Sequence, residues 1–300
     1  MPRVNQMRSK CNHFSVAREL LGQPSEYLYC NDWAEVQTLI TPTCKKNWLT
    51  RRKSLLIIVK SAPERFERRM AYRKTLSNVK QVGGFRLRTI FVMGMSSKWL
   101  QFKGSQLEAE AIRFQDMLVG DFHDNYFNNT LKYFNSMKWA RWHCFPSSSL
   151  IPYLVLMDDD YMVNVTGLIS LLERTTPNEQ LYTGYRFDTT PFRLTFQKFR
   201  VSIEEYPYNA FPPYCSGGFV LYSPQAVREF YAAIQHLRTF RFDDVYAGIV
   251  AHYLGYEVQM NRNFLFKRDD SIPWTTKIAE HEWTAKEIEN AFASINTVKR

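Results

Sequence analysis

Short, uninterrupted apolar runs alternate with helical stretches from residue 54 to residue 172, and this alternation constrains the fold more than any other feature of the sequence. A strand that is apolar at every position is buried on both faces. Strands separated by helices of this length build a parallel sheet. The sequence therefore predicts an α/β fold, with a mostly parallel sheet flanked by helices on both faces. The expected strands are Leu55–Val59, Arg88–Met93, Asp116–Val119 and Tyr153–Met157, and the expected helices are Glu64–Leu76, Ser105–Phe114, Asn125–Trp142, Val165–Leu172 and Val245–Leu254.

The alternation divides the chain into two parts. Residues 1–53 show no sustained periodicity and hold three of the five cysteines, so we expect an irregular N-terminal extension there. Residues 54–300 are expected to form one large domain, because 45% apolar and 15% aromatic content supplies a substantial core.

The net charge of +10 admits anionic partners such as nucleic acid, an acidic membrane surface or a phosphate-bearing ligand. The basic residues are scattered, however, and no zinc-finger spacing or basic region with heptads accompanies them. We therefore expect no nucleic-acid partner. The five cysteines form no CxxC pair, which argues against a zinc site.

Signals for the secretory route are weak in this sequence. Two glycosylation triplets begin at Asn128 and Asn164, and such triplets are also common by chance. No stretch reaches the roughly 18 apolar residues of a membrane-spanning helix. The first residues lack the apolar centre of a signal peptide.

Three consecutive aspartates, Asp158–Asp160, follow the last predicted strand. Ligands collect at the carboxyl ends of strands in open α/β sheets. Because successive side chains of an extended segment alternate, Asp158 and Asp160 are expected to face one crevice and Asp159 the opposite side. Adjacent carboxylates need a cation or strong donors nearby, and oxygen ligands favour Mg²⁺ or Mn²⁺. The alternative is a solvated acidic turn before the next helix.

Four sequence blocks follow one another along the chain: Ile58–Pro63 with Glu67–Thr75, Asp121–Lys132, Asp158–Asn164, and Phe211–Gly218 with Asp243–Gly248. In this order they resemble the β-1,3-galactosyltransferase and β-1,3-N-acetylglucosaminyltransferase family of inverting, GT-A-fold hexosyltransferases, glycosyltransferase family 31. The resemblance implies transfer of galactose or an N-acetylhexosamine from a UDP-sugar to a glycan hydroxyl, with a β-1,3 linkage.

The same resemblance implies roles for individual residues. Asp244 is the implied catalytic base, and its neighbour Asp243 is expected to raise its pKa; the alternative is that both merely cap a helix. Asp160 is the implied ligand of Mn²⁺, with Mg²⁺ possible, and His281 is a second candidate ligand. The implied donor-binding residues are Arg69, Arg73, Lys132, Asp158 and Asp159, and the implied acceptor-pocket residues are Tyr214, Ser216, Gly217, Gly218 and Asp243.

Some of these roles have plain alternatives. Arg69 and Arg73 lie four residues apart on one helix face, which suits a diphosphate but also suits an exposed charge pair. Family analogy pairs Cys144 with Cys215 as a disulfide, against two buried thiols. The triplet that begins at Asn128 makes this residue a glycosylation candidate.

Departures from the family pattern at Leu76, Leu156 and Asp243 motivate a second hypothesis: a catalytically silent, glycan-binding relative with the same fold. The resemblance further implies a Golgi membrane location with a lumenal catalytic domain, although no span is visible in this sequence. The donor sugar stays open between galactose, N-acetylglucosamine and N-acetylgalactosamine. The acceptor stays open between glycoprotein, glycolipid and proteoglycan linker.

Overall fold

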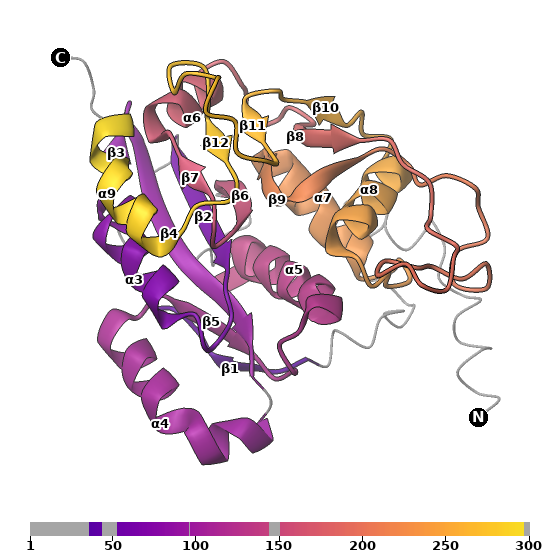
Figure 1. Ribbon diagram of the computed structural model, residues 1–300, viewed down its shortest axis with the longest axis horizontal. Coiled ribbons are helices and arrows are strands. Elements are labelled where there is room, and N and C mark those ends of the chain that lie inside the picture. Colours follow the sequence, from indigo (N-terminus) through magenta and orange to yellow (C-terminus); the bar gives the residue numbers. More distant parts are fainter. Residues whose placement is uncertain (1–35, 44–52, 96, 144–150, 297–300) are drawn as a thin grey trace.

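The strand β2 (Ser54–Lys60) is buried at all seven positions and lies in the middle of the sheet. The computed structural model describes residues 36–43, 53–95, 97–143 and 151–296 (Figure 1). On one side β2 pairs in parallel with β4 (Phe85–Gly94), and on the other with β6 (Tyr153–Asp158). The continuous apolar runs thus form the central parallel strands, as predicted.

The main sheet has nine strands among the described residues, in the order β1-β5-β4-β2-β6-β9-β8-β10, with β3 paired to β4. The half from β5 to β6 is parallel, whereas β9 runs antiparallel to both β6 and β8. The expectation of a mostly parallel sheet therefore holds for the first half of the chain only. The remaining strands are β1 (Thr38–Ile40), β3 (Gln81–Val82), β5 (Met117–Gly120), β8 (Tyr182–Phe187), β9 (Tyr214–Tyr222) and β10 (Gln259–Met260).

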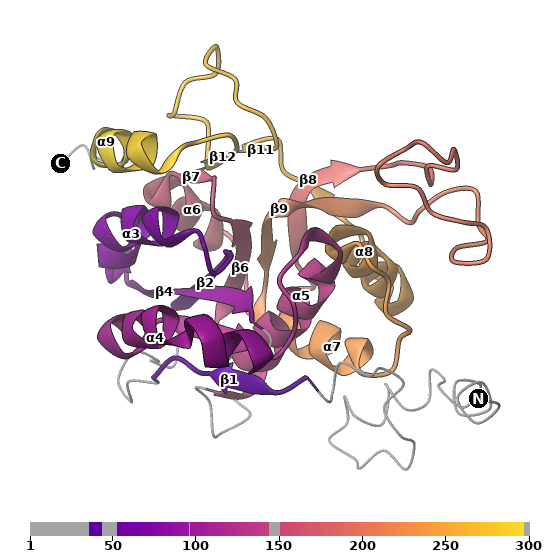
Figure 2. The ribbon, with the colours of Figure 1, turned by 60° about the horizontal axis from the view of Figure 1, so that its bottom comes forward.

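Helices cover both faces of this sheet (Figure 2). Alternate residues of β2 separate the two cores: Leu56 packs with α5, α7 and α8, and Leu55 packs with α3, α4, α6 and α9. The predicted α/β fold is thereby confirmed. The helices are α3 (Phe66–Lys74), α4 (Ser97–Phe114), α5 (Asn129–Lys138), α6 (Val165–Leu172), α7 (Pro224–Ile234), α8 (Asp243–Leu254) and α9 (Ala285–Ile295), with short turns at Leu76–Asn78, Tyr126–Asn128 and Trp139–His143.

A second, three-stranded sheet lies beside the end of β6. It consists of β11 (Phe264–Leu265), β12 (Ala279–Glu280) and β7 (Met162–Val163). The strand β7 follows the aspartate triplet directly, and β12 pairs with it, so this sheet brings residue 281 next to residue 160.

One part of the predicted N-terminal extension differs from the expectation. The strand β1 pairs antiparallel with β5 and forms an edge of the main sheet. Residues 38–40 are too short and too isolated in the sequence for a strand pattern to be seen. The rest of the boundary at residue 53 stays a prediction.

Candidate active site

The aspartate triplet lies at the carboxyl end of β6, level with the end of the neighbouring strand β2. In the parallel register Lys60 stands opposite Asp158, and its Nζ lies 3.0 Å from Oδ1 of that aspartate. The three carboxylates differ in exposure: the side chain of Asp158 is 39% exposed and that of Asp160 25%, whereas Asp159 is fully buried. The predicted alternation is therefore present, with two carboxylates open to solvent and one turned inward.

Asp159 is held by cations from the start of α3. Its Oδ1 accepts a hydrogen bond of 2.6 Å from Arg65, its Oδ2 accepts one of 3.0 Å from Ser61, and Arg68 binds its carbonyl oxygen at 2.9 Å. Burial raises the pKa of Asp159 although Arg65 opposes this effect. Arg65 itself is 49% exposed and stands at the edge of the site. Asp159 thus organises the arginines around the triplet.

Asp160 faces an imidazole from the loop after β12. Nε2 of His281 lies 3.1 Å from Oδ1 of Asp160, and Nδ1 of His281 lies 3.1 Å from the carbonyl oxygen of Phe266. The Oδ1 atom is buried and accepts no well-aligned hydrogen bond. The contact with Asp160 raises the pKa of His281. Burial opposes ionisation of Asp160, but His281 lowers the pKa of this carboxyl below its ordinary value.

The ring of Tyr161 supports this pair from below. It stacks on His281 with ring centroids 4.9 Å apart. It also lies against Gly218 so closely that a β-carbon there would come within 2.3 Å of the tyrosine oxygen. Only glycine fits at position 218 because the ring of Tyr161 occupies this space. The expected place of Gly218 in the acceptor pocket stays a prediction.

A second acidic pair begins the helix α8 and is joined to the triplet by Lys60. Nζ of Lys60 lies 2.9 Å from Oδ2 of Asp243 as well as close to Asp158. Burial disfavours the charged ammonium, but the two carboxylates outweigh it and raise the pKa of Lys60. The single buried cation therefore ties the end of β6 to the start of α8.

Asp244 follows Asp243 in the chain, and the pKa of its carboxyl is strongly shifted. Burial and the charge of Asp243 raise the pKa of Asp244 to about 7. Its Oδ1 accepts a hydrogen bond of 2.7 Å from the backbone of Val245. The expected elevation of one pKa in the pair is present, and a carboxylate with a pKa near neutrality suits a general base. The residue that precedes the helix is Phe242, so the alternative of a side-chain N-cap does not describe this pair.

Gly217 lies against these acidic residues. A β-carbon at this position would lie 3.3 Å from Cβ of Asp244 and 3.5 Å from Nζ of Lys60. Ser216 adjoins Gly217 in β9, whereas Tyr214 is buried and hydrogen-bonds Thr189 at 3.0 Å. Four of the five predicted acceptor-pocket residues thus lie along β9, which passes Asp244 at Gly217, and the fifth, Asp243, begins α8.

Two of the predicted donor-binding arginines have other partners. Nε of Arg69 lies 2.7 Å from Glu110, and Arg69 is fully buried. Arg73 is also buried and lies 2.7 Å from Glu110 and 2.8 Å from Asp116. The spacing of four residues correctly predicted that Arg69 and Arg73 share one face of α3, but this face turns toward α4 and β5. We therefore assign both residues to a buried ion-pair cluster and not to donor binding.

Lys132, a predicted donor-binding residue, is paired within the protein. Its Nζ lies 2.7 Å from Asp124 and donates a hydrogen bond of 2.8 Å to the carbonyl oxygen of Ser61. It is buried and neutralised, so it supports the loop that carries Ser61. Its direct contact with a donor stays a prediction.

Two predicted modification sites remain untested. Cys215 is buried, and its proposed partner Cys144 lies outside the described residues. The side chain of Asn128 is half-buried and donates a hydrogen bond of 2.7 Å to the carbonyl oxygen of His123.

Within the described residues, no group of three or more histidine, cysteine, aspartate or glutamate side chains is arranged to enclose a metal ion by protein ligands alone. In the same ranges, no helix is long and apolar enough to cross a membrane.

Known proteins with this sequence pattern are sugar transferases. The family model described as galactosyltransferase matches residues 67–262. That range contains the triplet and the Asp243–Asp244 pair. The chain belongs to the galactosyltransferase family.

Individual relatives agree with this assignment. The β-1,3-galactosyltransferase bre-5 of Caenorhabditis elegans is 32% identical over 85% of this chain and 79% of its own length. The β-1,3-galactosyltransferase brn of Drosophila melanogaster is 36% identical over 76% of this chain and 70% of its own. The human UDP-GalNAc:β-1,3-N-acetylgalactosaminyltransferase 1 is 32% identical over 78% and 72%. The chain is accordingly a glycosyltransferase.

Sequence reasoning missed three cations of this site: Lys60, Arg65 and Arg68. Lys60 stands within the first of the blocks quoted above, but one lysine at a strand end carries no pattern of its own. Arg65 and Arg68 lie three apart at the start of α3, and helical spacing alone does not say which face meets the triplet.

Proposed function

We propose that the protein is an inverting hexosyltransferase that moves galactose or an N-acetylhexosamine from a UDP donor to a glycan hydroxyl, forming a β-1,3 bond. The carrying observation is the Lys60 bridge, which joins Asp158 of the triplet to Asp243. Asp243 is the immediate neighbour of Asp244, whose pKa is raised to about 7. A leaving-group site and a base are both needed for transfer with inversion. The printed activities of the relatives support the same reaction.

The residues around Asp160 fit a divalent cation such as Mn²⁺. Because a carbonyl oxygen only accepts, Nδ1 of His281 carries the proton toward Phe266, and in the neutral ring Nε2 is then an unprotonated acceptor 3.1 Å from Oδ1 of Asp160. Two acceptor atoms 3.1 Å apart repel each other unless a proton or a cation lies between them. Metal-binding histidines commonly give their second ring N–H to a carbonyl oxygen in this way. Asp160 and His281 would hold the ion, which supplies charge neutralisation for a departing diphosphate.

Two protein ligands leave most coordination positions open. Cations of this type usually combine one or two protein ligands with phosphate oxygens and waters. The absence of a larger cluster in the described residues is therefore compatible with a cation that is bound together with the nucleotide.

Asp244 would act on the acceptor. In the proposed step the acceptor oxygen forms a bond with the anomeric carbon of the donor, and the bond from this carbon to UDP breaks. The electron pair leaves with UDP, and the acceptor proton passes to Asp244. Lys60 forms ion pairs with Asp243 and Asp158 beside this centre.

Arg65 and Arg68 are the arginines that we assign to the donor side. Both contact Asp159, and Arg65 is half exposed at the edge of the triplet. A guanidinium in this position favours a diphosphate because its donors form a fixed fork.

A catalytically silent, glycan-binding protein is the second candidate. The departures at Leu76 and Leu156 motivated it, but Leu76 is a buried core residue and Leu156 is buried within β6. Leu156 lines a small cavity beside Lys60 and the Asp243–Asp244 pair, where it is an apolar wall and not a charged group of the site. The third departure, Asp243, keeps the negative charge that pairs with Lys60. The retained Asp160 and Asp244 support an active enzyme, located by family analogy at the lumenal side of the Golgi membrane.

A donor screen tests the proposal. UDP release is measured with UDP-galactose, UDP-N-acetylglucosamine and UDP-N-acetylgalactosamine, in the presence of Mn²⁺ and a panel of p-nitrophenyl glycosides of single hexoses. The proposal predicts release that depends on both acceptor and metal, and a β-1,3 product by NMR. UDP binding in calorimetry without release from any donor would favour the silent relative.

A further inference from the structure

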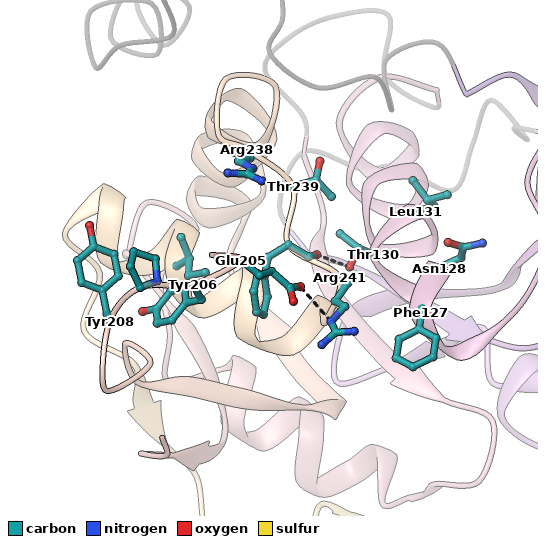
Figure 3. Close-up of a pocket in the computed structure, with 13 residues that line it drawn as sticks. Phe127, Asn128, Thr130, Leu131, Glu205, Tyr206, Tyr208, Arg238, Thr239 and Arg241 are labelled. Atoms are coloured by element: carbon teal, nitrogen blue, oxygen red, sulfur yellow. Dashed lines mark hydrogen bonds and ion pairs between the residues drawn. The ribbon is translucent and has the colours of Figure 1, made fainter. Parts of the chain in front are cut away.

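A pocket of about 480 Å³ opens beside the catalytic pair and takes no part in the chemistry described above. Four segments line it: the start of α5 with the turn before it, the loop between α7 and α8, the loop between β8 and β9, and the helix α8 through Ile249 (Figure 3). The first two segments adjoin functional residues, because one carries Lys132 and the other leads into Asp243. The pocket therefore lies at the same end of the sheet as the proposed base.

One aromatic layer separates the pocket from the acidic pair. Phe127 lines the pocket, and its ring centroid lies 6.4 Å from that of Phe242, the residue just before Asp243. The phenol of Tyr126, the residue next to Phe127, interacts electrostatically with the same two carboxylates. Burial together with the charges of Asp244 and Asp243 raises the pKa of Tyr126 to about 12. The pocket is thus one ring contact away from the residue that precedes the acidic pair, and an acceptor chain that starts at Asp244 would extend toward it.

The lining combines flat apolar rings with fixed polar groups. Tyr208 is 66% exposed and Phe127 is 47% exposed, so both offer open ring faces. Between them lies the ion pair of Arg241 with Glu205, whose Nε–Oε1 distance is 3.0 Å. Aromatic faces pack on the C–H faces of pyranose rings, and planar charged groups bind pairs of vicinal hydroxyls. Mostly apolar walls with a few fixed polar groups are typical of small-molecule sites.

The wall is rigid before any ligand arrives. Arg193 donates hydrogen bonds of 2.9 Å to the carbonyl oxygen of Tyr206 and 2.7 Å to that of Tyr208. The ring of Tyr206 is packed against Phe240 at 5.9 Å. A preformed wall reduces the entropy that a bound ligand must lose.

We propose that this pocket is an acceptor subsite that binds sugar residues further along the glycan than the one that receives the transferred hexose. The inference rests on the proposed function and adds that acceptors of two or more sugars are preferred. Its volume is within the range of ligand sites of about 300–1,000 Å³, which suits an oligosaccharide segment.

The test compares a short and a long acceptor. The short one is the single-hexose p-nitrophenyl glycoside that is active in the donor screen, and the long one is a trisaccharide glycoside that ends in the same sugar. Tyr208→Ala removes one ring face, and Glu205→Gln removes the charge that fixes Arg241. Phe196→Ala is the matched control, since Phe196 is 82% exposed in the same loop but does not line the pocket.

For Tyr208→Ala we expect kcat/KM for the trisaccharide to fall about threefold to tenfold, the range of one aromatic contact. The value for the single sugar should stay unchanged, and Phe196→Ala should change neither. An equal loss on both acceptors, or no loss on the trisaccharide, overturns the subsite. A wild-type enzyme that uses no acceptor at all contradicts the proposed function instead, so the two failures are distinguishable.

A second experiment uses Asn128, which also lines the pocket. A glycan attached to this side chain would fill the pocket with the chain's own sugars. If the Tyr208→Ala effect is the same in the Asn128→Gln background, the acceptor occupies the pocket. If it disappears there, the pocket serves the attached glycan and the proposal is wrong.

Discussion

Lys60, the last residue of β2, donates a hydrogen bond of 2.9 Å to Oδ2 of Asp243, the first residue of α8. The two residues are 183 positions apart in the sequence. Because Lys60 also contacts Asp158 at 3.0 Å, one cation holds the proposed donor side and the proposed base side together. This relationship predicts how the site responds to mutation and to pH.

Removal of the bridge should destabilise the protein. Lys60→Met leaves Asp158 and Asp243 without their shared cation, and breaking a buried ion pair costs about 3–5 kcal/mol. Urea unfolding measures the loss. Lys74→Met is the matched control, because Lys74 forms an exposed pair with Glu289 and such pairs contribute about 0–1 kcal/mol. Equal stability of the two variants would contradict the bridging role.

Loss of the base should stop transfer but not donor binding. Asp244→Asn keeps the shape of the side chain and removes the proton acceptor, so kcat should fall by about 10²–10⁴. Calorimetry should give unchanged UDP affinity, since a base acts in the transition state. A variant with wild-type turnover would exclude Asp244 as the base.

The pH dependence of activity should report the same carboxyl. Asp244 is a base only when ionised, and its pKa of about 7 means that kcat/KM rises with pH through a midpoint near 7. Asp243→Asn removes the neighbouring negative charge that raises this pKa, so the midpoint should move to lower pH. A midpoint that is unaffected by this change would show that another group controls the profile.

Substitutions of the arginines at the triplet and of the arginines in the buried cluster should have different effects. Arg65→Ala alters an exposed residue beside the triplet, so UDP affinity should weaken while the unfolding midpoint stays close to that of the wild type. Arg69→Ala removes one of the two arginines that pair with the buried Glu110 and leaves the carbonyl oxygens of Ala62 and Pro63 without this donor, so it should lower the free energy of unfolding by about 1–3 kcal/mol. The reverse pattern would restore the sequence-based assignment of Arg69 to the donor site.

The sequence predicted the parallel half of the sheet because β2 and β6 are buried on both faces and are therefore apolar throughout. It did not predict that β9 runs antiparallel to β6. The strand β9 contains Ser216, Gly217 and Gly218 where it passes the site, and these residues interrupt the apolar pattern. The strand was therefore not recognised, because its residues beside the site are polar or glycine and not apolar.

Site residues were predictable where several carboxylates stand together, as in Asp158–Asp160 and Asp243–Asp244. Cations were harder to assign, because a lysine or arginine is most often a solvated surface group. Spacing placed Arg69 and Arg73 on one face but not toward the triplet, and Lys60 became visible only through the register of β2 with β6.

A crystal soaked with Mn²⁺ and UDP tests the central claim most directly. The account predicts an anomalous manganese peak bonded to Asp160 and His281, with the UDP diphosphate completing the coordination and Arg65 close to a phosphate oxygen. Manganese elsewhere in the protein, or UDP bound away from the end of β6, would contradict it.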